Sequence, residues 1–175
     1  MKHVDCLLGQ LSHYKECLLY VHVPFCRKKC DYCDFYSCTL LDETLLAAFT
    51  QQVCREIETA LALRKAPFST LFIGGGDPGV LGVHRLEQII ASAATAGLPS
   101  EITVECNPES LSNDFLSTVG KQITRLSVGI QSLQPHNLQT LGRAASLDQT
   151  WSGMKKLEAH RDSFELNIDL MNAIP

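Results

Sequence analysis

The sequence predicts an α/β fold in which a parallel sheet is covered by helices. Short apolar runs rich in β-branched residues alternate along the chain with longer segments of helical periodicity. These runs are nearly continuous in hydrophobicity, without strict alternation of polar and apolar residues, which is typical of buried parallel strands. No Gly/Ser-rich linker or low-complexity tract divides the chain, so we expect one continuous α/β unit.

The first half of the chain is expected to form two strands, each followed by a helix. The strands are LLYVHV, Leu18 to Val23, and TLFI, Thr70 to Ile73. The first helix begins near Asp42 or Thr44, because apolar residues then recur every three or four positions and line one face. The second helix is predicted from Leu81 to Ala96, with a glycine and a proline just beyond it as stop signals.

The second half of the chain repeats this alternation. Strands are expected at Ile102 to Cys106, Arg125 to Ile130 and Phe164 to Leu170, where apolar and β-branched residues are concentrated. Weaker helical patterns occupy Leu111 to Val119 and Leu147 to His160. In such folds functional groups gather at the carboxyl ends of the strands, so polar residues at these ends are candidates for a site.

Composition and charge exclude several classes of protein. Hydrophobic residues make up 45% and charged residues 19% of the chain, which is ordinary for a globular protein and unlike a disordered one. Fifteen Lys and Arg against nineteen Asp and Glu give a net charge of −4, so there is no basic excess for a nucleic-acid backbone. No stretch approaches the roughly 18 uninterrupted apolar residues of a membrane span.

The start of the chain indicates the compartment. Residues 1–17 are interrupted by charged side chains and contain no continuous apolar segment of the roughly 7 to 15 residues that an export signal needs. We therefore expect a cytoplasmic protein, in which thiols stay reduced and clustered cysteines favour metal binding over disulfides.

Three of the eight cysteines lie close together just after the first predicted strand. Cys26, Cys30 and Cys33 have C-x3-C-x2-C spacing on one loop, which favours metal ligation over incidental thiols. A structural zinc site normally needs four ligands, and Cys38 is the available fourth. A [4Fe-4S] cluster also usually takes four cysteines, so three would leave one iron open to an outside ligand.

A glycine loop follows the second predicted strand. GGGDPG, residues 74–79, formally matches the G-x-G-x-x-G pattern of dinucleotide-binding folds. Such folds need an acidic residue about 20 positions further on, but Glu101 and Glu105 lie beyond that distance and Pro78 fits the pattern poorly. A plain structural turn or the close approach of a ligand remain open for the three glycines.

Taken together, the cysteine triplet and the glycine loop strongly resemble the radical SAM superfamily. In that superfamily the open iron binds the amino and carboxylate groups of S-adenosylmethionine, and an aromatic residue, here Tyr32, commonly precedes the third cysteine. The glycine loop resembles the superfamily's GGE-like segment, which contacts the methionine amino group. The resemblance implies an open barrel of six βα units with helices on the outer face, of which about five parallel strands are present here.

Further segments resemble the group that contains oxygen-independent coproporphyrinogen III oxidase and the HemW-type haem chaperone. They are LLYVHVPFCRKKCDYCDF, TLFIGGGDP, EITVECNP, RLSVGIQS, LGR and NIDLM, in family order. The resemblance implies the cluster ligands Cys26, Cys30 and Cys33, and the S-adenosylmethionine contacts Tyr20, Tyr32, Gly75, Gly76, Asp77, Glu105, Gln131, Arg143 and Asp169.

Four of these residues are suited to a ligand site by their side-chain chemistry and position alone, without the resemblance. Glu105, Gln131 and Asp169 lie near the ends of three predicted strands, so their side chains are expected to meet at one mouth of a barrel. Carboxylates and amides suit ribose hydroxyls, an amine or a sulfonium. Arg143 is suited to a bidentate contact with a carboxylate.

Within this group one position favours the chaperone type. The oxidases have a further cysteine two residues after the third ligand, where this chain has Phe35. The implied function is binding and delivery of haem, with radical chemistry incidental. The alternative is the oxidase, in which a 5′-deoxyadenosyl radical takes hydrogen from a porphyrinogen propionate. Both imply haem or a porphyrin as ligand and an electron donor of the flavodoxin or ferredoxin type. A non-catalytic zinc-binding module is the third hypothesis.

The chain also departs from the family pattern. Asp77 stands where the family usually has threonine, and its charge would repel a carboxylate or attract an amine. The family usually has a histidine shortly after the GR pair, where this chain has Ala144 and Ala145. After NIDLM the family usually has a tyrosine-glycine pair, where this chain has Asn172 and Ala173.

The length suggests a partial barrel. We expect residues 1–17 to be an N-terminal extension and residues 18–175 a truncated radical SAM core without the sixth βα unit and the C-terminal domain. A complete eight-stranded barrel takes typically about 250 residues. The last strand should then have an exposed edge, which favours association or poor solubility.

Overall fold

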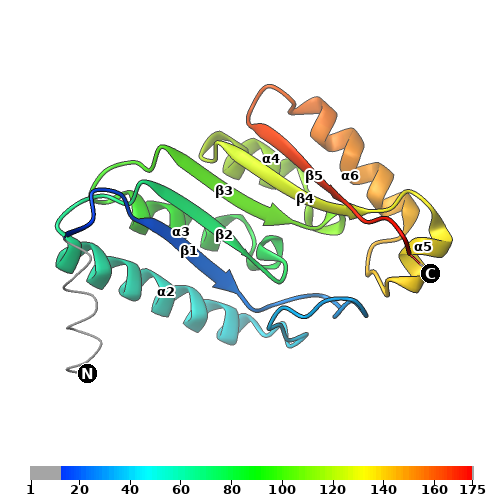
Figure 1. Cartoon of the computed structure of the whole chain (residues 1–175), viewed down its shortest axis with the longest axis horizontal. Helices are drawn as coiled ribbons and strands as arrows, with labels where there is room; N and C mark the ends of the chain where they lie inside the picture. The colour runs from blue at the N-terminus through cyan, green and yellow to red at the C-terminus, as the bar shows by residue number, and fades with distance from the viewer. Residues whose placement is uncertain (1–12, 175) are drawn as a thin grey trace.

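One sheet of five parallel strands organises the chain, as the computed structural model, which describes residues 13–174, shows in Figure 1. The strands are β1 (Leu18–Val23), β2 (Thr70–Gly75), β3 (Glu101–Cys106), β4 (Arg125–Gln131) and β5 (Glu165–Leu170). Each strand pairs in parallel with the next, in the order β1-β2-β3-β4-β5. Because every pair is parallel, all five carboxyl ends lie at one edge of the sheet, and the predicted α/β class is confirmed.

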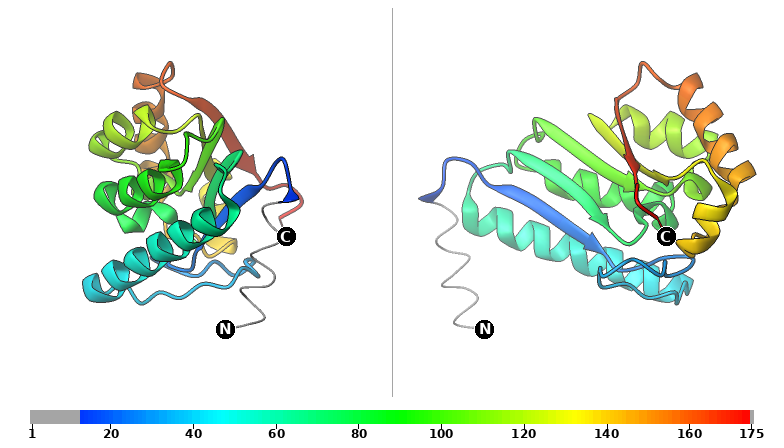
Figure 2. Two further views of the ribbon diagram at one scale, coloured as in Figure 1. Left: turned by 90° about the vertical axis from the view of Figure 1, so that its left-hand side faces the viewer. Right: turned by 45° about the vertical axis from the view of Figure 1, so that its right-hand side comes forward.

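The helices cover one face of this sheet (Figures 1 and 2). They are α2 (Glu43–Arg64), α3 (Val83–Ala94), α4 (Asn113–Thr118) and α6 (Leu147–Ala159), with short 3₁₀ turns η2 (Pro78–Leu81), η3 (Pro108–Ser110) and η4 (Val119–Lys121). The first turns of α2, α4 and α6 are capped by side chains that the sequence supplies, whereas α3 begins after Gly82 without a side-chain cap. Asp42 accepts from Leu45 N at the start of α2, and Ser146 forms a capping box with Gln149 at the start of α6.

One helix was not expected from the sequence. α5 (Pro135–Thr140) follows β4 and begins with proline at its first turn. Its six residues make less than two turns, which is too short for an apolar periodicity to be visible in the sequence.

The core lies between the sheet and the helices. The two faces of the sheet differ in polarity, which the strand sequences did not predict. Ile73, Val104 and Val128 point to the helices and are 0% exposed. The opposite face is polar, since Glu105 lies beside Ser127 and Ser127 beside Asn167 in the strand register. The strands therefore alternate in the usual way. The expected near-continuous hydrophobicity fails at these positions of β3 to β5, where the face without helices carries polar side chains.

β5 is the least covered strand. It pairs with β4, and three of its side chains on the helix side, Leu166, Ile168 and Leu170, are 46%, 41% and 68% exposed. These fractions agree with the exposed final strand expected from the sequence, while association and the six-unit barrel stay predictions.

Two further expectations concern membranes and thiols. In residues 13–174 no helix has the length and hydropathy needed to cross a bilayer. Every cysteine in this range is a free thiol. Cys6 and most of the expected N-terminal extension lie outside the described residues.

Candidate functional site

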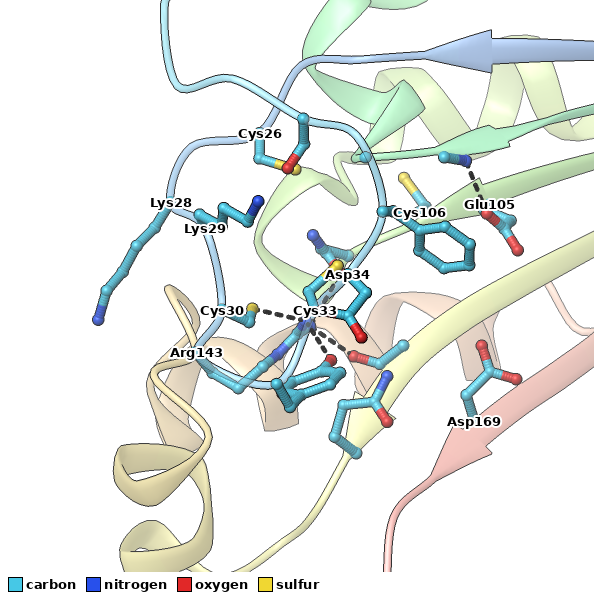
Figure 3. Close-up of a pocket in the computed structure, with 18 of the residues that line it drawn as sticks. Cys26, Lys28, Lys29, Cys30, Cys33, Asp34, Glu105, Cys106, Arg143 and Asp169 are labelled. Atoms are coloured by element: carbon cyan, nitrogen blue, oxygen red, sulfur yellow. Dashed lines mark hydrogen bonds between the residues drawn. The ribbon is translucent and has the colours of Figure 1, made fainter.

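A pocket of about 490 Å³ opens at the carboxyl edge of the sheet, beside the cysteine loop (Figure 3). This volume is in the range of small-molecule sites. The pocket brings together ten residues that the sequence analysis had singled out: Cys26, Cys30, Tyr32, Cys33, Gly75, Gly76, Glu105, Gln131, Arg143 and Asp169. The cysteines line one side on their loop, and Glu105 and Asp169 reach the pocket from strands β3 and β5.

The cysteine loop is held at both of its ends. At its start, the buried Phe25 ring packs edge-on against Phe49 of α2, with ring centroids 5.2 Å apart. At its end the chain returns beside its own start, because Cys26 N donates to Cys38 O at 2.9 Å and Cys38 N to Pro24 O at 2.7 Å. The two ends of the loop that carries the three thiols are thus held by a ring contact and by backbone hydrogen bonds.

The electrostatics around Cys26 favour its neutral form. Burial raises the pKa of the Cys26 thiol to about 11, and the Asp77 carboxylate and the other two loop cysteines add to the rise. The Ser37 hydroxyl acts in the opposite direction and favours the thiolate. A metal bound to this thiol would have to displace its proton.

The glycine loop packs directly against the cysteine loop. Gly76 N donates to Val23 O at 2.8 Å, and a Cβ on Gly76 would lie 2.5 Å from Phe25 O and 2.8 Å from Cys26 Sγ. Gly75 has a φ of +110°, which side-chain-bearing residues rarely adopt. The glycines therefore serve both as a turn and as a site of close approach, and the approaching group in the structure is the cysteine loop.

Glu105 connects the glycine loop to the polar face of the sheet. Its Oε2 accepts a hydrogen bond from Gly75 N at 3.0 Å. Burial raises the pKa of Glu105, and the carboxylate of Asp169 adds to that rise. Asp169 in turn accepts from Ser127 Oγ at 3.3 Å and from Asn167 Nδ2 at 2.7 Å, so its orientation is fixed by two neighbours.

Gln131 ends β4 in an unusual conformation. It has a φ of 63°, and the register between β4 and β5 shifts at this point as a β-bulge. Bulges and left-handed residues often direct a side chain into a site, and the pocket is lined by this glutamine.

Arg143 lies against the cysteine loop, deep in the pocket. Its Nη2 donates to Gly129 O at 2.7 Å and to Asn107 Oδ1 at 2.8 Å. Its Nη1 points to Cys30 Sγ at 3.5 Å and to the Tyr32 hydroxyl at 3.4 Å. Its Nε is buried and has no hydrogen-bond partner among the described residues.

Two predicted site residues do not line the pocket. Asp77 is 0% exposed, and its carboxylate accepts from Gly79 N, Asn107 N and Ser110 Oγ. The carboxylate thus joins three segments of the protein, and its expected contact with a cofactor stays a prediction. Tyr20 lies on β1, outside the residues that line the pocket, with its hydroxyl 3.0 Å from His22 Nδ1.

The other departures from the family pattern also lie outside the pocket lining, at Ala144, Ala145, Asn172 and Ala173.

Several lining residues were missed by the sequence analysis. They are Lys28, Lys29, Asp34, Ser37, Asn107, Ser127 and Gly129. For Ser127 a signal existed, because it is two residues before Gly129 and four before Gln131 on one strand and therefore shares their face. Ser37 had none, since only the return of the loop places it beside Cys26.

The donor set fits an iron–sulfur cluster better than a single metal ion. Within residues 13–174, no group of three or more His, Cys, Asp or Glu side chains is gathered tightly enough for one ion. Cys38, the fourth zinc ligand considered, packs against the hydrophobic core and does not line the pocket. In a [4Fe-4S] cluster each thiolate binds a different iron, so the thiols need not share one centre. Two buried polar atoms without hydrogen-bond partners, Ser37 Oγ and Arg143 Nε, belong to residues that line the same pocket.

The carboxylate of Glu109, on η3, leads to a prediction on the pH dependence of stability. Glu109 Oε2 is buried without a hydrogen-bond partner in the described part of the chain, and burial raises the pKa of Glu109 above 4.5. The folded protein then binds more protons than the unfolded chain, so the free energy of unfolding falls as pH rises from about 4.5 through the raised pKa. We expect Glu109→Gln to remove this loss, and its advantage over the parent to grow between pH 4.5 and 7 in urea denaturation.

Glu158→Gln is the matched control, because Glu158 is exposed on α6. A constant difference between parent and Glu109→Gln across this pH range would contradict the prediction.

Comparison with known proteins agrees with the family resemblance of the sequence motifs. The family model of the radical SAM superfamily matches residues 20–174. Among curated proteins, the chain is 32% identical over 163 residues to heme chaperone HemW of Escherichia coli, covering 90% of this chain and 43% of that protein. It is 36% identical to the mitochondrial radical S-adenosyl methionine domain-containing protein 1 of Bos taurus, covering 90% of this chain and 36% of that protein.

An oxidase and two solved structures are also similar. The oxygen-independent coproporphyrinogen III oxidase of Bradyrhizobium diazoefficiens is 29% identical, over 96% of this chain and 38% of that enzyme. The structure of the Escherichia coli coproporphyrinogen III oxidase HemN superposes with a TM-score of 0.82 at 24% identity, covering 98% of this chain and 41% of that one. The structure of anSMEcpe with bound AdoMet gives a TM-score of 0.58 at 15% identity, over 86% of this chain and 41% of that one. The chain thus spans less than half of each of these proteins.

Proposed function

Because this chain belongs to the radical SAM superfamily, we propose that it binds a [4Fe-4S] cluster through Cys26, Cys30 and Cys33 and S-adenosylmethionine in the adjoining pocket. The observation that carries the proposal is the pocket itself. It joins the three thiols to a glycine loop and to polar side chains from the ends of β3, β4 and β5. The cluster, when bound, would supply the single electron that cleaves S-adenosylmethionine.

The residues of the pocket have separate tasks in this proposal. The three cysteines hold the cluster and leave one iron for the methionine amino and carboxylate groups. Glu105, Gln131 and Asp169 offer carboxylate and amide groups to the amine and the ribose hydroxyls, and the bonds from Ser127 and Asn167 fix Asp169 in place. Arg143 offers a cation beside the cysteine loop.

We propose further that the function is of the haem chaperone type. Phe35 stands where the oxidases have an additional cysteine, and HemW proteins are among the similar curated proteins at 28 to 34% identity. The ligand would then be haem, the electron donor a flavodoxin- or ferredoxin-type protein, and the location the cytoplasm. A coproporphyrinogen oxidase-like activity is the second candidate, supported by the similarity to the Bradyrhizobium oxidase.

Anaerobic reconstitution with iron and sulfide tests the cofactor proposal. We expect about four irons and four sulfides per chain, brown colour, and release of methionine and 5′-deoxyadenosine from S-adenosylmethionine under a strong reductant. Zinc is the comparison: stoichiometric zinc binding by the three cysteines with no iron–sulfur absorption would refute the cluster and leave the metal-binding module.

Haem titration of the reconstituted protein separates the two family functions. A chaperone type is expected to bind haem, seen as a shift in its absorption, and to release no carbon dioxide from coproporphyrinogen III. Carbon dioxide release with no haem binding would favour the oxidase instead.

A further inference from the structure

Ser37 is a pocket residue that the cofactor proposal leaves without a role. Its hydroxyl oxygen is buried, lines the pocket and makes no hydrogen bond of ordinary geometry among the described residues. Leaving a buried hydroxyl unsatisfied is destabilising, so an unpartnered hydroxyl in a site points to a partner that the site acquires on binding.

The backbone fixes this hydroxyl before anything binds. Phe25 and Cys38 form a parallel bridge, and the two hydrogen bonds Cys26 N to Cys38 O and Cys38 N to Pro24 O hold the residue that follows Ser37. On the other side, the carbonyl of Tyr36 is 2.8 Å from His22 Nε2 of β1. Ser37 is thus fixed between two tethered residues, next to Cys26.

The position of Ser37 next to Cys26 indicates which partner its hydroxyl could acquire. A protonated thiol is a weak acceptor, whereas a thiolate accepts strongly from a hydroxyl. Ser37 and Cys26 line the same pocket, and the hydrogen bond from Cys26 N to the carbonyl of Cys38, the residue after Ser37, holds the two residues side by side. Cys30 has a corresponding neighbour, because Arg143 Nη1 lies 3.5 Å from its sulfur.

We propose that Ser37 donates a hydrogen bond to the Cys26 thiolate when that thiolate binds iron, and that this bond raises the reduction potential of the cluster. The proposal rests on the cofactor assignment above. Adding one electron makes the cluster and its thiolates more negative, so a donor to sulfur stabilises the reduced form more than the oxidised form. Arg143, which carries a full positive charge beside Cys30, would also raise the reduction potential of the cluster.

Ser37→Ala tests the proposal, with Ser37→Thr as the variant that keeps the hydroxyl. In a redox titration followed by electron paramagnetic resonance, the alanine variant is expected to show about a tenfold lower ratio of reduced to oxidised cluster at a given potential. This corresponds to a midpoint about 59 mV more negative for a one-electron couple. The threonine variant should stay near the parent, as should Ser117→Ala on α4, whose hydroxyl bonds to Asp114 O.

A parent-like midpoint in Ser37→Ala with full iron content would overturn the inference and leave the cofactor proposal intact. Failure of the parent to assemble a cluster would overturn both. The parent also provides a measurement that needs no variant: its iron–sulfur stretching bands in resonance Raman spectra should shift between H₂O and D₂O, and unchanged bands would again overturn the inference.

Discussion

Replacing Cys30 by alanine is expected to abolish assembly of the [4Fe-4S] cluster. Among residues 13–174, three loop thiols line the pocket beside the predicted cluster position. The one other lining thiol, Cys106, is buried on β3, and the Cys38 side chain packs on the core. Removing one of three ligands leaves two irons without protein ligands, where the superfamily's chemistry requires only one open iron. We expect iron and sulfide content and the visible absorption of the reconstituted variant to fall to background.

Cys54→Ala is the matched control, because Cys54 is a partly buried thiol on α2 that does not line the pocket. It should keep the full cluster. Since Cys30 is itself only partly buried on a loop, its variant should retain the far-ultraviolet circular dichroism of the parent. A Cys30→Ala protein with parental iron content would refute the ligand assignment.

Replacing Asp77 by alanine is expected to lower the free energy of unfolding by about 3 kcal/mol. The Asp77 carboxylate accepts hydrogen bonds at 3.1 Å from Gly79 N, 3.2 Å from Asn107 N and 2.6 Å from Ser110 Oγ. Alanine would leave all three donors unsatisfied. The loss is limited because burial raises the pKa of Asp77, which shows that the carboxylate is itself poorly solvated. Urea denaturation under reducing conditions measures the change.

Asp77→Asn is the conservative partner of this variant. Its amide oxygen can still accept from the two backbone N–H groups, and Ser110 can accept from its NH₂ group, so a loss smaller than that of alanine is expected. At a temperature where both variants are folded, the affinity for S-adenosylmethionine should equal that of the parent. A large loss of that affinity in Asp77→Asn, without a loss of stability, would instead support the cofactor contact that the sequence pattern suggested.

The sequence was sufficient for features that depend on local pattern. The strands at residues 18–23 and 125–130 are visible as apolar, β-branched runs, and α2 follows from its periodicity and the capping residue Asp42. The cysteine spacing is equally local, because a loop of eight residues keeps its thiols together in any fold. The gathering of Glu105 and Asp169 followed from one rule, that parallel strands end at the same edge.

Tertiary structure alone decided the roles of individual side chains. Asp77 and Gly76 are adjacent in one loop, yet Gly76 lines the pocket and the Asp77 carboxylate turns to Ser110 on the opposite side. Ser37 acquires its place only because the chain returns to bridge Phe25 with Cys38. The apolar pattern likewise concealed that the inner face of the sheet is polar and uncovered. Local sequence sets periodicity and ligand spacing, whereas the direction of a loop side chain depends on backbone torsions and on contacts with segments distant in the chain, which no short pattern encodes.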